Sequence, residues 1–440
     1  MRFVDLIARK RDGGEHPPEE IRALVRGVAD GSLPDYQAAA WLMAAFLRGL
    51  SPGETLELTL AMRDSGVRVD LSSIPGIKLD KHSSGGVGDK TTLVVVPMLA
   101  AAGVPVLKMS GRGLGHTGGT VDKLESIPGF RTGLSLEEAL AQVRAVGAAL
   151  VGQSAELVPA DKRLYVLRDV TATVDSIPLI AASIMSKKLA SGADRVLLDV
   201  KVGRGAFMKS LDKARELARL MVRLGGLAGV ETTAALTAMD EPLGWAVGSA
   251  LEVAEACATL TGGPRVDRRF RELCVRLCAR GLVMAEKVPD ELSGIAAAER
   301  LLECGEAAGK FQQILQAQGA SPAVVSDPGL LPRAPLVAPV ESSGEGFVAA
   351  IDSEAIGRLV MEMGGGRARK EDAIDPAVGI VLHRKTGDPV RRGGLLAEVH
   401  LARPEEEAAG RVLAAFTLAP DPPPESPIIY EFVNSEPAEP

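Results

Sequence analysis

The chain has 440 residues, which is enough for two or three domains with substantial hydrophobic cores. Lysine and arginine number 50 against 57 aspartate and glutamate, giving a formal net charge of −7. This balance excludes a sequence-wide basic surface for nucleic acid or anionic membranes, and 3% aromatic residues exclude stacking platforms for single-stranded nucleic acid.

Cysteine usage and the hydropathy pattern indicate a cytosolic protein. The four cysteines lie apart from the five histidines in the sequence, and Cys274 and Cys278 have the spacing of one buried helical face. We therefore expect core packing, with neither a metal site nor a disulfide framework. The first 14 residues contain no apolar run long enough for a secretion signal. Residues 91–107 are uncharged, but Pro97 and Pro105 divide them, which favours a buried helix and strand over a membrane span.

Residues 3–65 carry the signals of four helices, at 3–10, 18–29, 35–48 and from Ser51 to Gly66. Ser51 and Glu54 form a capping box, with proline at the first helical position. The third helix is apolar nearly all round, which is typical of a central helix or of one in an interface. We therefore predict a helical domain over residues 1–66 and a subunit contact through it.

Two loops rich in glycine and hydroxyl residues, 81–88 and 110–120, bracket an apolar helix (89–102) and an apolar strand (104–109). The first loop follows a predicted strand at 77–81, and the second ends at Thr120, where a helix N-cap is expected. Ligands gather at such strand ends, and freed backbone N–H groups, hydroxyls and lysines suit a phosphate-sized anion. The converging side chains would be Lys81, Ser83, Thr92, Lys108, Ser110 and Thr120. The alternative is that the hydroxyls only cap helices and the glycines only turn the chain.

Two nucleotide-binding motifs are matched in part and rejected. Residues 113–118 fit G-x-G-x-x-G, but Pro128 and Gly129 follow too soon for a crossover helix. The acidic residues about twenty positions further on lie at a helix start and not at a strand end. Residues 85–92 are not a P-loop, because Asp89 separates the glycine from the lysine.

The next segment predicts a helix at 135–146, a strand at 149–153 and helices at 161–168 and 176–190. In the last helix Ser183 and Lys187 project from one face, so we place Lys187 in a pocket. Lys188 shares its stripe with Ile184 instead. A solvated helix face is the alternative for the pair. A strand at 195–200 leads into a loop, 201–205, whose glycines suit a mobile flap, and a helix follows at 210–223.

Residues 228–330 are predicted to continue with alternating strand and helix, including mostly helical residues 243–259 and a helix at 267–280. From about residue 332 the pattern changes to a strand at 347–351, a helix at 353–363 and antiparallel β structure over 379–401. The end of the chain is proline-rich.

The chain resembles the thymidine/pyrimidine-nucleoside phosphorylase family over essentially its whole length. The matching motifs are KHSSGGVGDKTT from Lys81, KMSGRGLGHTGGTVDKLESIPGF from Lys108 and LRDVTATVDSIPLIAASIMSKK from Leu167. The resemblance implies an α/β protein (α+β overall) that forms a homodimer. In each subunit a small all-helical domain would be hinged to a large α/β domain with a mixed sheet. The active site would lie in the cleft between them. The expected domains are residues 1–66, joined in space by about 161–192, then 67–331, and a β-rich C-terminal α/β subdomain, 332–440.

The resemblance further implies reversible phosphorolysis of a pyrimidine nucleoside to free base and pentose 1-phosphate, without an organic cofactor. Family phosphate contacts fall on Lys81, His82, Ser83, Thr92, Lys108, Met109, Ser110 and Thr120. Contacts to the pyrimidine fall on Arg168, Ser183 and Lys187. A structural potassium site would fall on Gly88, Lys90, Leu243, Ala246 and Glu255, although Lys90 replaces the hydroxyl residue expected there. Thymidine-restricted relatives carry an apolar residue in place of Lys108, so we expect uridine, deoxyuridine and thymidine all to be accepted.

The chemistry assigns a role to each group. The lysines and hydroxyls would neutralise phosphate, while Arg168 and Lys187 stabilise the negative charge that leaves with the base. His82 would pass a proton to the base or hold the sugar, with a pKa suited to neutral pH; a purely structural donor is the alternative. The rival functions are a thymidine-restricted phosphorylase, a phosphoribosyltransferase of related fold, and a non-catalytic phosphate-binding dimer.

Overall fold

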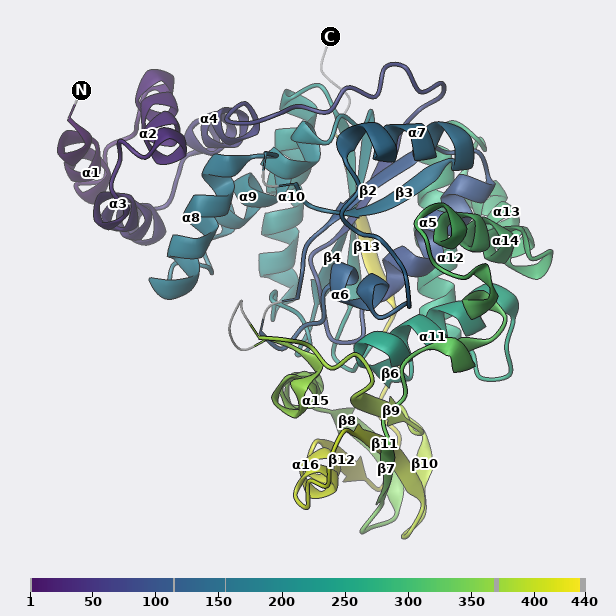
Figure 1. Ribbon diagram of the computed structural model, residues 1–440. Coiled ribbons are helices and arrows are strands. Elements are labelled where there is room, and N and C mark those ends of the chain that lie inside the picture. Colours follow the sequence, from purple (N-terminus) through teal and green to yellow (C-terminus); the bar gives the residue numbers. More distant parts are fainter. Residues whose placement is uncertain (1, 114, 155, 368–371, 436–440) are drawn as a thin grey trace.

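The computed structural model describes residues 2–113, 115–154, 156–367 and 372–435. Figure 1 shows a helical bundle at the left, a central sheet surrounded by helices, and a β-rich unit at the bottom. The expected fold class is confirmed. None of the helices within the described ranges is long and apolar enough to cross a membrane.

The bundle contains the first four helices and two that come later in the chain. They are α1 (Phe3–Arg11), α2 (Pro18–Asp30), α3 (Asp35–Arg48), α4 (Pro52–Arg63), α8 (Pro159–Val170) and α9 (Ile177–Ala190). The predicted capping box of Ser51 and Glu54 is present at the start of α4. Trp41 of α3 is fully buried, and its indole N–H donates to Nε2 of His16 (3.1 Å).

The central sheet is mixed. Strands β1 (Leu79–Ser83), β4 (Arg195–Val202) and β5 (Glu231–Ala238) run parallel, and β13 (Ile429–Asn434) lies antiparallel to β5. A parallel pair, β2 (Val106–Ser110) and β3 (Ala148–Gly152), lies beside β1, where the Leu79 N–H donates to the Pro105 carbonyl (3.1 Å). Strands β1 and β2 therefore both end where the two glycine-rich loops begin.

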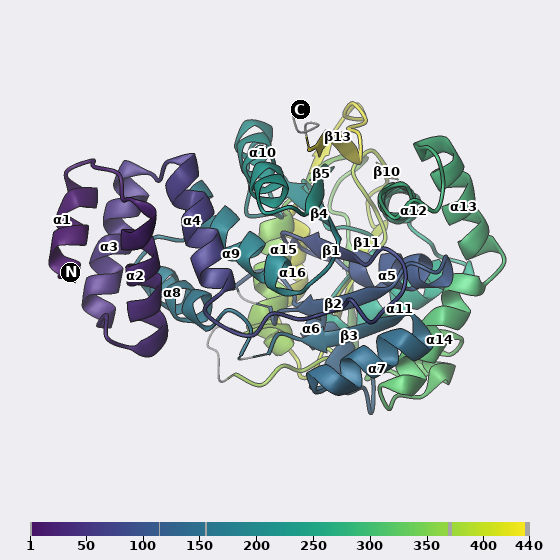
Figure 2. The same cartoon turned by 90° about the horizontal axis from the view of Figure 1, so that it is seen from above.

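Helices pack against both sides of this sheet. They are α5 (Thr91–Ala101), α6 (Thr120–Glu125), α7 (Leu136–Val146), α10 (Leu211–Leu227), α11 (Ser249–Thr261), α12 (Arg268–Met284), α13 (Glu291–Glu303) and α14 (Glu306–Ala317). Figure 2 shows α12, α13 and α14 on the side of the molecule away from the bundle. The predicted alternation over 228–330 is wrong, because after β6 (Ala246–Val247) four α-helices follow one another. Short apolar runs do not distinguish a strand from a buried helix.

Helix α9 joins the bundle to the sheet because it is apolar on two sides. Leu179 and Ala182 belong to the core of the bundle, whereas Ala181 and Met185 pack with β4 and α10. A third side is left for Ser183 and Lys187. Figure 1 shows α9 between the bundle and α10.

The C-terminal unit is built on two antiparallel sheets. Its elements are β7 (Leu336–Glu341), β8 (Gly346–Ile351), α15 (Ser353–Val360), β9 (Gly379–Leu382), β10 (Pro389–Val390), β11 (Leu395–Leu401), α16 (Ala408–Ala414) and β12 (Phe416–Ala419). The predicted helix 353–363 ends early, at Val360, and a π-helical turn with Gly364 at φ 96° follows. Strand β6 pairs with β9, which ties this unit to the central part. The domain boundaries given above stay a prediction.

Candidate active site

The loop after β1 is held by a buried hydrogen-bond network. Lys81 is inaccessible to solvent, donates to Thr91 Oγ1 (2.5 Å) and lies 3.3 Å from Asp199. Thr91 in turn donates to Asp89 (2.7 Å), which also accepts from the Ser83 hydroxyl. Burial opposes ionisation of Asp89, but the surrounding lysine ammonium groups outweigh it and hold the pKa of Asp89 well below its usual range. Lys81 and Ser83, both predicted phosphate contacts, are thus linked through the Thr91 hydroxyl and the Asp89 carboxylate.

Strand β2 lies beside β1, so the second loop begins next to the first. Lys108 is buried and lies 3.6 Å from Asp80 of β1. Burial and the neighbouring Lys188 ammonium lower the pKa of Lys108 to about 7, against the opposing effect of Asp80. The Ser110 hydroxyl is buried without a hydrogen-bond partner among the described residues, which is costly unless a ligand supplies one.

Asp80 and Lys188 form an ion pair that the sequence analysis missed. The Lys188 ammonium donates to Asp80 Oδ2 (2.7 Å), and both side chains are almost wholly buried. Lys188 shares the apolar stripe of Ile184, and the helix pattern alone therefore does not predict a site role for it. That position itself indicates a buried ion pair, because a lysine ammonium in a buried apolar stripe needs a carboxylate to balance its charge. The pair links α9 to β1 directly beside Lys108.

His82 lies among four lysines from both parts of the predicted site. Burial, followed by Lys188, Lys108, Lys81 and Lys187, lowers the pKa of His82 well below 6.5. The expectation of a pKa suited to neutral pH is therefore wrong for the ligand-free protein, because four positive charges disfavour the imidazolium. The same interactions place residues of β1, β2 and α9 around one centre.

The pyrimidine contacts expected from the resemblance come from α8 and α9. Lys187 donates to Asp161 (2.5 Å) and to the Ser183 hydroxyl (2.9 Å). Arg168 donates three hydrogen bonds to the carbonyls of Thr173, Val174 and Leu179. The cationic groups of Arg168 and Lys187 each lie 5.9 Å from the ring centroid of one tyrosine, Tyr165, which the sequence analysis did not single out.

Spare donors remain on both cations. A guanidinium has five N–H donors and an ammonium three. Arg168 uses three and Lys187 two in the bonds just described, so each can still donate to a ligand.

The remaining phosphate contacts lie on or beside the same loops. Thr92 is buried in the first turn of α5, and Met109 precedes Ser110 at the end of β2. Thr120 is the first residue of α6, and Gly119, not Thr120, occupies the N-cap. The predicted N-cap role is therefore wrong by one residue.

The five residues named for potassium come together around an ammonium group. Nζ of Lys90 donates to the carbonyl oxygens of Gly88 (2.9 Å), Leu243 (2.6 Å) and Ala246 (3.2 Å), and it lies 2.9 Å from Glu255 Oε2. These residues do not fit a potassium ion as they stand, because a positive charge already lies among the oxygens.

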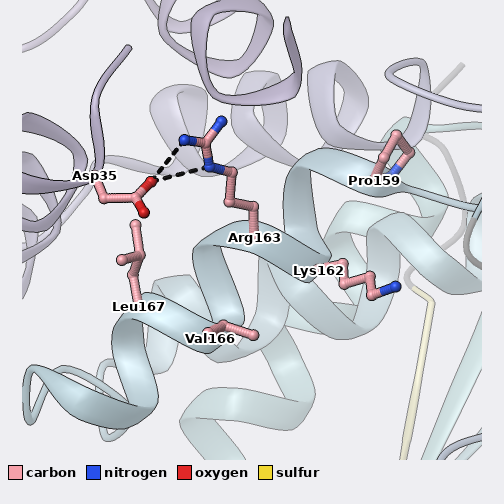
Figure 3. A pocket seen from close by; sticks show the side chains of 6 residues that line it. All are labelled: Asp35, Pro159, Lys162, Arg163, Val166 and Leu167. Atoms are coloured by element: carbon pink, nitrogen blue, oxygen red, sulfur yellow. Dashed lines mark hydrogen bonds and ion pairs between the residues drawn. The ribbon is translucent and has the colours of Figure 1, made fainter. Parts of the chain in front are cut away.

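A surface hollow between α3 and α8 is separate from this site. It is lined by Asp35, Pro159, Lys162, Arg163, Val166 and Leu167. Figure 3 shows the Arg163 guanidinium paired with Asp35 above the apolar side chains of Val166 and Leu167.

Three family models match successive parts of the chain. Residues 4–66 match the helical bundle domain of a glycosyl transferase family, and residues 76–308 match the a/b domain of the same family. Residues 347–419 match the pyrimidine nucleoside phosphorylase C-terminal domain. The bundle, the mixed sheet and the loops between them are thus those of a glycosyl transferase.

Curated relatives cover nearly the same length. The chain is 51% identical to the pyrimidine-nucleoside phosphorylase of Geobacillus stearothermophilus over 403 residues, 92% of this chain and 93% of the relative. It is 50% identical to that of Bacillus subtilis, with the same coverage, and 46% identical to that of Staphylococcus aureus over 95% and 96%. The chain belongs to the pyrimidine-nucleoside phosphorylase family, as the resemblance had indicated.

Among solved structures, anthranilate phosphoribosyltransferase from Thermus thermophilus superimposes with a TM-score of 0.57 at 20% identity. The superposition covers 71% of this chain and 98% of that one. At this identity the likeness shows the fold alone.

Proposed function

We propose that the protein catalyses the reversible phosphorolysis of pyrimidine nucleosides to the free base and a pentose 1-phosphate. Membership of the family supports the reaction class, that of a pentosyltransferase. The observation that carries the proposal is the convergence of four lysines on His82, two from strands β1 and β2 and two from α9. Such a cluster suits an oxyanion and a departing anionic base held next to each other.

The phosphate would be bound by Lys81, His82, Ser83, Thr92, Lys108, Met109, Ser110 and Thr120. Two features support this assignment: the amino end of α5 at Thr92 and the unpartnered hydroxyl of Ser110. Each charge-assisted hydrogen bond contributes about 1.5–3 kcal/mol. Bound in this way, a phosphate oxygen attacks the anomeric carbon of the sugar.

The bond between that carbon and the pyrimidine nitrogen breaks, and its electron pair leaves with the base. The spare donors of Arg168 and Lys187 would stabilise the resulting charge on a carbonyl oxygen, while Ser183 orients the ring. His82 is neutral in the ligand-free protein. The phosphate dianion offsets the lysine charges, raises the pKa of His82 and so equips it to hold or pass a proton.

The reaction needs inorganic phosphate as co-substrate and no organic cofactor. The potassium ion that the resemblance implies has no step in this mechanism, because the Lys90 ammonium lies among its ligands. Lys108 in β2 supports acceptance of uridine and deoxyuridine as well as thymidine. The cytoplasmic location stays a prediction from cysteine usage.

A homodimer through the helical bundle is proposed on the exposed apolar side chains of α3 and α8. Tyr36, Leu47, Val166 and Val170 are 74%, 71%, 55% and 75% exposed. Tyr36 and Leu47 lie three helical turns apart, and Val166 and Val170 one turn apart, so each pair shares a face. Val166 also borders the hollow in Figure 3. Light scattering on the purified protein should give twice the mass of the chain, and Val170→Asp should shift it toward the monomer.

The function is tested by following the ultraviolet absorbance of uridine and thymidine with and without orthophosphate. Release of uracil and thymine should require phosphate and should run backward from base and pentose 1-phosphate. Cleavage of thymidine alone would leave the thymidine-restricted alternative. Transfer of the pentose from a pyrophosphorylated pentose to a base in the presence of magnesium would instead support the phosphoribosyltransferase alternative. The likeness of fold is the only observation in favour of that alternative.

A further inference from the structure

Lys90 occupies a position built for a positive ion. Three backbone carbonyls and one carboxylate surround its Nζ at 2.6–3.2 Å, and the side chain is inaccessible to solvent. An ammonium has three protons, so four oxygen neighbours are more than it can bond singly. Rings of carbonyl oxygens are typical of sites that replace the hydration shell of a monovalent metal ion.

The ring around Lys90 is tightly constructed. At Gly88, with φ 76°, a Cβ would lie 2.7 Å from the Leu243 carbonyl oxygen. At Gly244 a Cβ would lie 2.4 Å from Glu255 Oε1. Glu255 itself is fixed by accepting from the N–H groups of Trp245 (2.7 Å) and Ala246 (2.8 Å). Backbone packing and these hydrogen bonds therefore fix the oxygens around the ammonium, and their positions do not depend on attraction by its charge alone.

The ring connects three parts of the molecule. Gly88 and Lys90 belong to the loop that leads into α5, at whose start Thr92 lies. Leu243 and Ala246 belong to the segment entering β6, which pairs with the C-terminal unit, and Glu255 lies on α11. A positive charge at the centre thus fixes the phosphate loop to the rest of the fold.

We propose that the Lys90 ammonium is a covalently tethered replacement for a monovalent metal ion, so that this protein orders its phosphate loop without potassium. The charge of the ammonium equals that of K⁺, and the adjacent Glu255 balances it. A second monovalent cation within the ring would be repelled by Lys90 at contact distance. Lys90 is a positioning residue in this proposal, since it acts through the loop.

The test compares the wild-type protein with Lys90→Thr, which removes the ammonium and leaves a hydroxyl. Melting temperature and turnover are measured in potassium chloride and in choline chloride at equal ionic strength. The wild type should behave identically in both salts. Lys90→Thr should lose about 10²-fold in turnover in choline chloride through displacement of the loop, and potassium should restore most of that loss together with the melting temperature.

Lys385→Thr is the matched control. Lys385 also donates to carbonyls of the segment before β6, those of Pro242 and Gly244, but it lies outside the ring. This variant should lose stability without any response specific to potassium. Crystals soaked with thallium(I) give a readout that needs no activity: an anomalous peak is expected within the ring of Lys90→Thr and not in the wild type.

Potassium-specific stabilisation of the wild type, or a thallium peak beside Lys90, would overturn the proposal. A folded Lys90→Thr that ignores potassium would overturn it as well. If Lys90→Thr fails to fold in either salt, the two wild-type measurements decide the question alone. Because melting and thallium binding do not depend on turnover, these results are distinguishable from a failure of the proposed function.

Discussion

The charge on Lys108 makes anion binding depend on pH in a range where few other groups of the site titrate. With its pKa lowered to about 7, Lys108 is protonated in about ten molecules of eleven at pH 6 and in about one of eleven at pH 8. If only the protonated form binds well, the apparent dissociation constant rises about tenfold between these values. The sign is that of a base: affinity is full below pH 7 and falls as pH rises through it.

Sulfate is the suitable probe, because its own charge stays constant over this range whereas that of phosphate does not. Calorimetric titration should give the tenfold loss, and binding at pH 7 should take up protons, since the bound anion raises the pKa of Lys108. Lys108→Met should bind weakly and without this pH dependence. A flat wild-type profile, or an unchanged tenfold slope in Lys108→Met, would refute the assignment.

Two further predictions concern α9 and its end. Lys187→Ala should lower turnover by about 10²–10³-fold while its affinity for sulfate stays the same. Lys162→Ala, on the exposed side of α8, is the control and should change neither quantity. An equal loss of turnover and of sulfate affinity in Lys187→Ala would contradict the assigned role. Gly192→Ala should lower the free energy of unfolding by more than Gly262→Ala, as urea denaturation would measure. Both glycines have positive φ, which costs about 1–2 kcal/mol for alanine. Only at Gly192 would the new Cβ meet a backbone carbonyl, that of Val69 at 2.2 Å, so equal losses would contradict the reasoning.

Local signals were enough to predict the four helices of the first 66 residues and the glycine-rich turns after β1 and β2. The capping boxes at Ser51 and Ser135 gave helix starts that the structure confirms, because both depend on residues three positions apart. Strand ends were less certain: the strand predicted at 77–81 lies at Leu79–Ser83, where pairing with β4 sets its limits. Pairing partners are distant in sequence and leave no local mark.

The electrostatics of the site were the least predictable part. The helix pattern predicts a pocket position for Lys187 but not for Lys188, because Asp80, the partner of Lys188, lies 108 residues away in the sequence. The sequence predicts an ordinary pKa for His82, because the four lysines around it come from three separate elements. Such shifts arise from burial and from charges brought together by the fold, and neither is visible along the chain.

The last described strand has a consequence for how the protein is made. Strand β13 covers the open edge of β5, although the two strands lie far apart in the sequence and β13 is made much later. Until β13 has been made, the edge of β5 therefore stays unpaired, and unpaired strand edges promote aggregation of nascent chains. Deletion of β13 would leave that edge exposed permanently, although every residue proposed for the catalytic centre would still be present.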